Sequence, residues 1–223
     1  LLNSFEFVEK KLDQVAISAS IKVKRKHYNC AYQLFTQEGP IALLPVQDNA
    51  ASVVWSLEKN SSILKLSQND LESKLNDLFK NHVSEMTIKN IQTQKLNFSY
   101  AKKMYQDKIV LIGNAAHNIH PIAGQGFNLT VKDISKIVYY IKKYHSLGLD
   151  INSYQVLENF SNSRKFDNFA FSFGTLAMEN IFSNKNNFIR NFTSKSLNLV
   201  NRSKKLKKFF IEKATGKIYF KNY

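Results

Sequence analysis

Residues 109–133 read IVLIGNAAHNIHPIAGQGFNLTVKD, and this stretch decides the fold. Four apolar residues run into Gly113, and Gly124 and Gly126 precede a long segment with helical periodicity. This order predicts a buried strand, an irregular loop and the start of a helix. A helix start carries unpaired backbone N–H groups and the positive end of the helix dipole, so it attracts an anionic or electron-rich ligand edge. Glycines there let a ligand approach the backbone closely.

The same stretch resembles the second flavin-contacting motif of the FAD-dependent aromatic hydroxylases. The shared residues are Gly113-Asn114-Ala115-Ala116-His117, Pro121, Gly124-Gln125-Gly126-Phe127-Asn128-Leu129 and Asp133. Within that superfamily the chain is most similar to the ubiquinone-biosynthesis hydroxylases of the 2-polyprenyl-6-methoxyphenol hydroxylase type. Most of the superfamily has Asp at the position of Asn114, whereas Asn also occurs there in the ubiquinone branch.

An upstream segment carries the resemblance beyond the loop. Residues 35–45, FTQEGPIALLP, and residues 52–55, SVVW, resemble the substrate domain of the same branch. The resemblance covers most of the chain and is strongest from about residue 32 to residue 140.

The resemblance implies an FAD-dependent monooxygenase that inserts one oxygen atom of O2 into the ring of a polyprenylated phenol during ubiquinone biosynthesis. The cofactors are then FAD and NAD(P)H, and the reaction passes through a flavin C4a-hydroperoxide. The partners that it implies are the phenol substrate, O2, a membrane surface and other ubiquinone-biosynthesis proteins.

The matched motif also implies roles for single residues. Backbone N–H groups at the helix start are candidates for stabilising negative charge at the N1/O2 edge of the flavin. Asn114 is expected to bond the ribitol, and Pro121 and His120 are the candidate catalytic residues at the reacting face. The expected cofactor-binding residues are Gly113, Asn114, Pro121, Gly124, Gln125, Gly126, Phe127 and Asn128. Asp133 receives no role, because an acid in the first turns of a helix is favoured by the dipole anyway.

Simpler interpretations remain for some of these features. Gly113 alone fits a strand-end turn, and the later glycines fit a helix entry without a ligand; their joint occurrence favours the flavin site. His117 and His120 have H-x-x-H spacing, but no third ligand accompanies them, so we expect no metal. Trp55 and residues 41–45 fit a core as well as a substrate cavity, and the phenylalanines of residues 166–173 are interpreted as packing.

Composition sets the bounds on size and class. The chain has 223 residues, of which 43% are apolar, enough for a sizeable core in one domain or one and a half. It begins Leu-Leu-Asn and contains no G-x-G-x-x-G between a strand and a helix. Because the FAD domain of the family needs that element, we expect a C-terminal part that lacks the nucleotide-binding half and is inactive alone.

The net charge of +15 has two interpretations. The lysines are spread through the chain, which fits compositional bias on a solvated surface, and we expect no nucleic-acid partner. The alternative is attraction to an anionic surface, and the densest cluster, residues 202–210, fits a membrane surface.

The one cysteine, Cys30, excludes an internal disulfide framework and indicates a reducing compartment. We expect a cytoplasmic protein, with peripheral attachment to the inner membrane left open.

The periodicity changes along the chain. Strands are expected at residues 15–23, 32–35, 41–46, 52–57 and 88–100, with a turn at Asp48-Asn49 and one helix capped by Asn69 or Asp70. From Phe127 onward the pattern is helical, with one apolar face, an end at Gly148 and further helices across 151–182 and 185–212. The apolar face consists of Leu129, Ile134, Ile137, Val138 and Ile141.

The fold class is therefore α+β / α/β, the C-terminal part of a flavin monooxygenase. We expect a mixed substrate-domain sheet with one helix in residues 1–107, the last part of the FAD-binding domain in 108–145 and a helical region in 146–223. Two other functions stay open: a related FAD-dependent hydroxylase or oxidoreductase acting on another aromatic or lipid substrate, and a non-catalytic basic module that binds membranes or nucleic acid.

Overall fold

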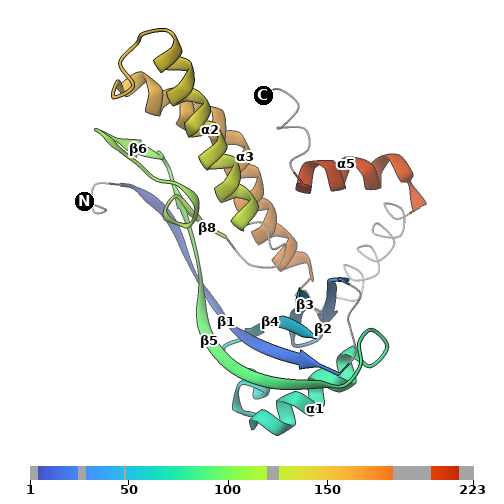
Figure 1. Cartoon of the computed structure of the whole chain (residues 1–223). Coiled ribbons are helices and arrows are strands. Elements are labelled where there is room, and N and C mark those ends of the chain that lie inside the picture. Colours follow the sequence, from blue (N-terminus) through green and yellow to red (C-terminus); the bar gives the residue numbers. More distant parts are fainter. Residues whose placement is uncertain (1–4, 25–28, 48, 120–125, 183–201, 216–223) are drawn as a thin grey trace. The chain divides into compact units, whose positions relative to one another are not determined.

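A computed structural model describes residues 5–24, 29–47, 49–119, 126–182 and 202–215 (Figure 1). Contacts divide the chain into two compact units. Residues 11–96 form the first, which we call the sheet unit. Residues 1–10 and 97–223 form the second, which we call the helical unit. The sequence analysis divides the chain by function instead, with boundaries at 107/108 and 145/146. Contacts do not test that division, so it stays a prediction.

Most of the strands belong to one six-stranded sheet with the order β2-β3-β4-β1-β5-β8. Its members are β1 (Phe7–Val23), β2 (Tyr32–Thr36), β3 (Gly39–Gln47), β4 (Ala50–Glu58), β5 (Met86–Ala101) and β8 (His117–Asn118). The strands expected from alternation are all present, and β1 begins eight residues earlier than expected. That extension is polar and largely exposed, so its sequence carries no alternating apolar pattern.

The core of the sheet unit lies between one face of the sheet and α1 (Gln68–Phe79). Antiparallel pairing places Ile17 on β1 and Ile41 on β3 opposite Trp55 on β4. The side chains of Trp55, Leu75 and Phe79 are almost completely buried in this core. Alternation therefore sorts the strand residues into a covered apolar face and an open face, as the sequence pattern predicts.

The N-cap of α1 differs from the expectation. Ser67 is the cap: its backbone is extended, and its Oγ accepts a bond from the N–H of Asp70 at 3.2 Å. Asn69 and Asp70 lie inside the first turn, so the expected cap at either of them is wrong. Ser67 satisfies a helix N–H that would otherwise lack a partner. A 3-10 turn, η2 (Ser62–Lys65), precedes it.

The helical unit begins with a short hairpin of β6 (Tyr105–Gln106) and β7 (Ile109–Val110). The turn η3 (Gly113–Ala115) and strand β8 follow, and then α2 (Gly126–Ser146), α3 (Tyr154–Phe182) and α5 (Lys204–Thr215). Helices α2 and α3 lie side by side (Figure 1). The buried strand expected at residues 109–112 is only partly correct: two residues are strand, Ile109 is 36% exposed, and Leu111 is buried.

The apolar face expected for α2 is wrong in part. Leu129 and Ile137 are buried as expected, but Ile134, Val138 and Ile141 lie on the exposed side. The covered side instead includes Lys132 and Asp133, whose side chains are buried. Apolar residues occur on two opposite sides of this helix, so periodicity alone does not tell which side is covered.

The later part of the chain is described in pieces. α3 agrees with the helix expected across residues 151–182. Of the helix expected across 185–212, residues 183–201 lie outside the described residues, and α5 covers the rest. Asp48 of the expected turn is also outside the described part. Among the described helices, none combines the length and apolar character that a membrane span requires.

Candidate functional site

The backbone conformation of Gly113 shapes the turn between β7 and β8. Its φ is +59°, in the left-handed region that glycine adopts without strain. A Cβ placed on Gly113 would lie 2.5 Å from Oγ1 and 2.8 Å from Cγ2 of Thr130, on the second turn of α2. Thr130 Oγ1 in turn donates to the carbonyl of Gly126 at 3.0 Å. Both the backbone angle at position 113 and the close packing of this residue against α2 therefore favour glycine over any residue with a Cβ.

Three of the expected cofactor-binding residues come together here. Gly113 is buried, and Asn114 after it is exposed. A Cβ at Gly126 would meet only Asn114 Oδ1 and Ile119 Cγ1, each at 3.9 Å. The side chain of Asn114 and the start of α2 are thus neighbours although twelve residues separate them in the sequence.

The start of α2 suits an electron-rich ligand edge. The helix begins at Gly126, and its first turn contains no acidic side chain. The N–H groups of its first turn have no partner within the helix, and the dipole is positive at this end. Phe127 is 76% exposed. Among the described residues, the start of α2 therefore places helix N–H donors close to the side chain of Asn114.

Four expected site residues lie outside the described part of the chain: His120, Pro121, Gly124 and Gln125. They include both candidate catalytic residues. Their roles stay predictions.

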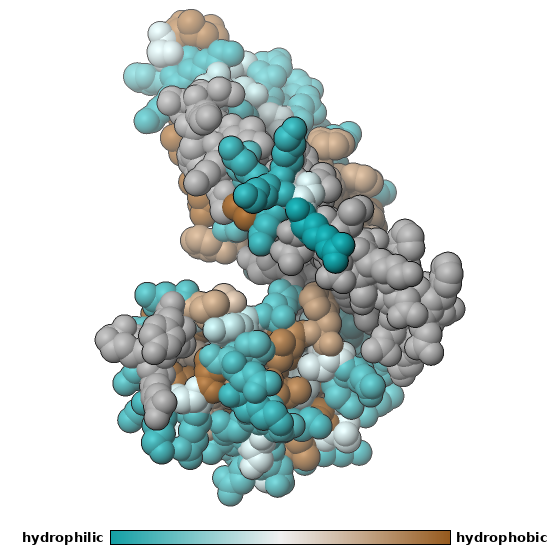
Figure 2. Space-filling model, turned by 90° about the vertical axis from the view of Figure 1, so that its right-hand side faces the viewer, coloured by the Kyte–Doolittle hydropathy of each residue, from teal (hydrophilic) through white to brown (hydrophobic). Residues whose placement is uncertain are grey.

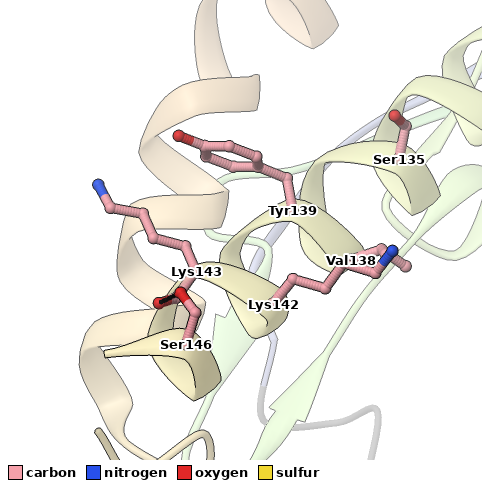
Figure 3. Close-up of a pocket in the computed structure, with 6 residues that line it drawn as sticks. All are labelled: Ser135, Val138, Tyr139, Lys142, Lys143 and Ser146. Atoms are coloured by element: carbon pink, nitrogen blue, oxygen red, sulfur yellow. Dashed lines mark hydrogen bonds between the residues drawn. The ribbon is translucent and has the colours of Figure 1, made fainter. Parts of the chain in front are cut away.

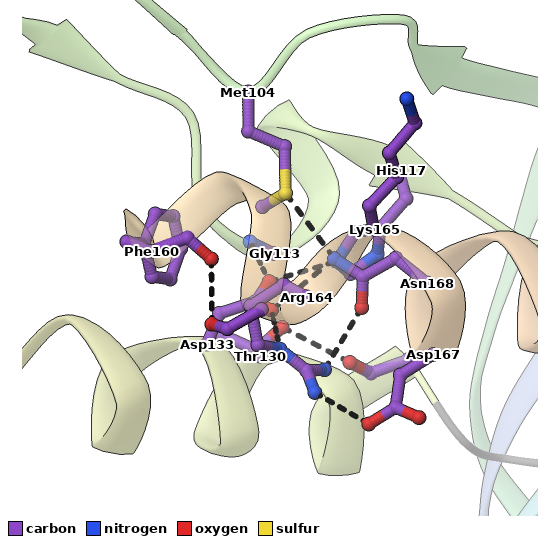
Figure 4. Close-up of polar contacts among 12 residues, drawn as sticks. Met104, Gly113, His117, Thr130, Asp133, Phe160, Arg164, Lys165, Asp167 and Asn168 are labelled. Carbon is purple, nitrogen blue, oxygen red and sulfur yellow. Dashed lines mark hydrogen bonds and ion pairs between the residues drawn. The ribbon is translucent and has the colours of Figure 1, made fainter. Parts of the chain in front are cut away.

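A buried ionic cluster lies directly behind the turn (Figure 4). At its centre is Asp133 on α2, with no exposed side-chain surface. Its Oδ2 accepts a bond from the N–H of Gly113 at 3.1 Å and lies 2.8 Å from Nε2 of His117. Its Oδ1 accepts from Nε of Arg164 at 2.7 Å and from Nδ2 of Asn168 at 3.3 Å. One carboxylate therefore joins the turn, β8 and α3.

Further bonds hold the guanidinium of Arg164. Its terminal nitrogens donate to Asp167 Oδ2 and to Asn168 Oδ1, both at 2.8 Å. Asn168 Nδ2 also lies 3.4 Å from the sulfur of Met104. The Arg164 side chain is 2% exposed, so this ion pair is removed from water.

The surroundings of Asp133 act on its pKa in opposite directions. Burial raises the pKa, because the charged form loses hydration, whereas the bonds from His117 and Arg164 lower it. The lowering prevails, and the pKa of Asp133 lies below its ordinary value. The carboxylate is therefore ionised at neutral pH and accepts charge-assisted hydrogen bonds, which are the stronger kind.

The motif analysis missed Arg164 and Asn168. Both lie on α3, more than thirty residues after Asp133. A signal exists in the spacing: Val156, Phe160, Arg164, Asn168 and Ser172 follow one another at intervals of four, and all are buried. These residues share one face of α3, which is apolar at Val156 and Phe160 and polar from Arg164 onward. Because the apolar residues indicate that this face is buried, the polar residues that follow on it are expected to be buried as well.

His117 takes no part in a metal site among the described residues. No group of three potential metal ligands occurs in the part of the chain that the structure describes. The ring bonds Asp133 through Nε2, and Nδ1 is buried with no partner among the described side chains and backbone. The second member of the H-x-x-H pair, His120, lies outside this part.

Two open depressions lie elsewhere. One of about 470 Å³ is lined by a single helix, α2 (Figure 3). Its lining residues are Ser135, Val138, Tyr139, Lys142, Lys143 and Ser146. Another of about 490 Å³ lies on the sheet unit, beside Ser20, Val46 and Lys89. Neither depression includes Gly113, Asn114 or Gly126. The candidate site is therefore located by its backbone and hydrogen-bond donors rather than by a depression.

The structure also decides between core and cavity for other residues. Trp55, Ile41 and Leu43 are core residues, whereas Leu44 is 41% exposed on the open face of the sheet. In the phenylalanine-rich stretch, Phe173 packs against Phe98 and Tyr100, as interpreted. Phe166 is 78% exposed, so the packing interpretation is wrong for it. Phe166 lies on a different face of α3 from the buried residues Arg164 and Asn168.

Known proteins resemble this chain over the same region. The family described as "FAD binding domain" matches residues 5–144. The ubiquinone hydroxylase UbiL of Rhodospirillum rubrum is 28% identical over 91% of this chain and 48% of its own length. The 3-demethoxyubiquinol 3-hydroxylase of Escherichia coli is 29% identical over 91% of this chain and 52% of its own length. The chain thus spans about half the length of these curated relatives.

Solved structures share the fold. The p-nitrophenol 4-monooxygenase PnpA of Pseudomonas putida superposes with a TM-score of 0.72 over 96% of this chain and 55% of its own, at 13% identity. PqsL of Pseudomonas aeruginosa, described as a probable FAD-dependent monooxygenase, gives a TM-score of 0.67 over 82% and 52%, at 15% identity. The α+β fold class is confirmed. Because the family match covers more than half of the chain and includes the Gly113 turn and nearly all of α2, the chain belongs to the FAD-binding domain family.

Proposed function

We propose that this chain supplies the flavin loop and the substrate-domain sheet of an FAD-dependent NAD(P)H monooxygenase that hydroxylates the ring of a polyprenylated phenol in ubiquinone biosynthesis. The proposal rests mainly on one observation: the side chain of Asn114 lies next to the start of α2 at Gly126. The relatives described above are named as ubiquinone-type hydroxylases, which supports the substrate class.

The residues of the site have separate roles in this proposal. When bound, the flavin supplies the redox chemistry, because it accepts hydride from NAD(P)H and reacts with O2. The N–H groups of Gly126, Phe127 and Asn128 stabilise negative charge on the polar edge of the ring system. Asn114 would bond the ribitol, and Pro121 and His120 are the candidate residues for the reacting face.

The position of Gly126 beside Asn114 gives a direct test in the full-length protein. Gly126→Val adds a branched side chain beside Asn114, where a Cβ makes only ordinary contacts of 3.9 Å with the described residues, and it occupies space at the proposed ligand edge. We expect wild type to purify with flavin absorbance and the variant to lose it. Gly174→Ala is the control, because a Cβ there meets nothing within 4 Å. Flavin retention in Gly126→Val would remove the loop from the site.

The substrate is tested by product analysis. Expression of the full-length protein in a strain that lacks ubiquinone ring hydroxylation should restore ubiquinone. A flavin-bound protein that restores none would instead be a hydroxylase for another aromatic or lipid substrate, which the shared fold equally permits.

Peripheral membrane attachment of a cytoplasmic enzyme completes the proposal. A polyprenylated substrate dissolves in the bilayer, and α5 exposes Lys204, Lys205, Lys207 and Lys208. Figure 2 shows hydrophilic side chains over most of the face that it draws. Charge reversal at the four lysines should weaken co-sedimentation with anionic liposomes. Unchanged sedimentation would leave compositional bias as the explanation of the charge.

A further inference from the structure

We propose that Asp133 is a positioning residue for the flavin loop, which holds the Gly113–His117 turn against α2 without touching the cofactor. The inference rests on the proposed function and adds a part of the site that the flavin motif alone does not assign. It depends on three features: which ends of the turn Asp133 binds, how its two oxygens are used, and which helix carries it.

Asp133 ties the two ends of the turn with one atom. Gly113 is the first residue of the turn and His117 the last, and both bond Oδ2. Between these fixed ends, Asn114 and Ala115 are exposed while Ala116 is buried. A single carboxylate oxygen therefore links both ends of the segment that carries Asn114, and it adds to the backbone bond between Ala116 and Gly113 within that segment.

The other carboxylate oxygen of Asp133, Oδ1, is occupied by hydrogen bonds from α3. Oδ1 accepts from Arg164 and Asn168, so the two oxygens together accept four bonds. A carboxylate offers about four lone-pair directions. Because the side chain is also fully buried, no oxygen is left to contact a ligand. Asp133 can affect the flavin only through the residues that it holds.

The position of Asp133 on α2 couples the turn to the helix start. Gly126 and Asp133 belong to the same helix, two turns apart. The helix α2 therefore carries the first N–H groups and also, through Asp133, holds the segment that contains Asn114. The ion pair with Arg164 keeps the carboxylate ionised, and hydrogen bonds to a charged acceptor are stronger than those to a neutral one.

Asp133→Asn in the full-length, FAD-loaded protein tests the proposal. Asparagine has nearly the same shape, but it places an NH2 group against N–H donors on one of its two sides. We expect the FAD dissociation constant to rise about tenfold or more and the visible circular dichroism of the bound flavin to change at saturating FAD. Loss of stability alone would not change that spectrum.

Asp167→Asn is the matched control. It removes the charge of another carboxylate that is bonded to Arg164. We expect FAD affinity within about twofold of wild type and an unchanged flavin spectrum. Equal weakening in both variants would overturn the proposal, as would wild-type affinity and spectrum in Asp133→Asn.

A second pair of variants keeps the test decisive if Asp133→Asn does not fold. His117→Leu removes the side-chain bond at one end of the turn, and His117→Gln keeps an N–H donor there. We expect His117→Leu to weaken FAD binding several-fold and His117→Gln to recover part of it. Equal affinities in the two variants would overturn the proposal. A wild-type protein that binds no FAD would instead overturn the proposed function, and this inference with it.

Discussion

The interiors of the two compact units differ in chemistry. The sheet unit has a continuous apolar core between its strands and α1, with Trp55 and Phe79 fully buried. The helical unit combines an apolar cluster around Phe160 with a buried charged cluster around Asp133 and Arg164. An apolar core stabilises through area and packing, which tolerate changes of pH. A buried ion pair depends on the charge state of its members, so the two units should respond differently to substitution and to acid.

The largest expected effects compare the two interiors directly. Phe79→Ala leaves a cavity in the sheet unit and should cost about 3–5 kcal/mol of its unfolding free energy. Arg164→Met leaves the Asp133 carboxylate buried without its ion pair to the guanidinium and should cost a similar amount, about 3–5 kcal/mol, in the helical unit. Hydrogen exchange of peptides from each unit measures both. Loss of protection in the other unit would contradict the comparison.

Acid should separate these two variants. The folded pKa of Asp133 is lowered, so its contribution is fully present above the ordinary carboxyl pKa and is lost as pH falls toward the folded value. In Arg164→Met the Asp133 carboxylate keeps its bonds from Gly113, His117 and Asn168 but loses the guanidinium charge, so it takes up a proton more readily than in wild type. The stability deficit of this variant relative to wild type should therefore shrink between pH 7 and pH 4. The deficit of Phe79→Ala should stay constant. Urea unfolding at both pH values checks this, and equal behaviour would contradict an ionic origin.

A pair of glycines tests packing at the turn. Gly113 and Gly148 both have positive φ, +59° and +68°. A Cβ at Gly113 meets Thr130 at 2.5 Å, whereas one at Gly148 meets nothing within 4 Å. Gly148→Ala should cost only the backbone strain, about 1 kcal/mol, and Gly113→Ala about 2–3 kcal/mol in all. Thermal unfolding of both variants gives the difference, and equal costs would show that Thr130 moves aside without loss.

The smallest expected effect concerns the cap of α1. Ser67→Ala removes the acceptor for the N–H of Asp70 and should cost about 1 kcal/mol. Asn69→Ala, at the position expected from the sequence to cap the helix, should change the unfolding free energy by less than about 0.5 kcal/mol. Urea unfolding of the sheet unit distinguishes them, and the reverse order would restore Asn69 as the cap.

Local patterns predicted much of the fold. Alternation located all the long strands, because one face of each is covered by α1. The glycines of the loop indicated a close approach of backbones, and Gly113 indeed packs on Thr130. The expected cap of α1 was misplaced by two or three residues, since Ser67, Asn69 and Asp70 are all good caps and only the observed backbone selects one.

The polar interior of the helical unit could not be predicted in the same way. Arg164 reaches Asp133 from another helix, and a pairing between helices leaves no fixed spacing in the sequence. The same limit applies to α2, where Leu129 and Ile134 are both apolar and only the first is covered. Periodicity shows which residues share a face, whereas burial depends on which face meets another element.

Trp55 gives the chain an intrinsic optical reporter. It is the only tryptophan of the sequence, and its indole is fully buried with no hydrogen-bond acceptor among the described residues. Emission from an indole in such dry surroundings lies at short wavelength and moves to longer wavelength once water reaches the ring. Because Trp55 lies in the sheet unit, its fluorescence follows the opening of that unit without a label.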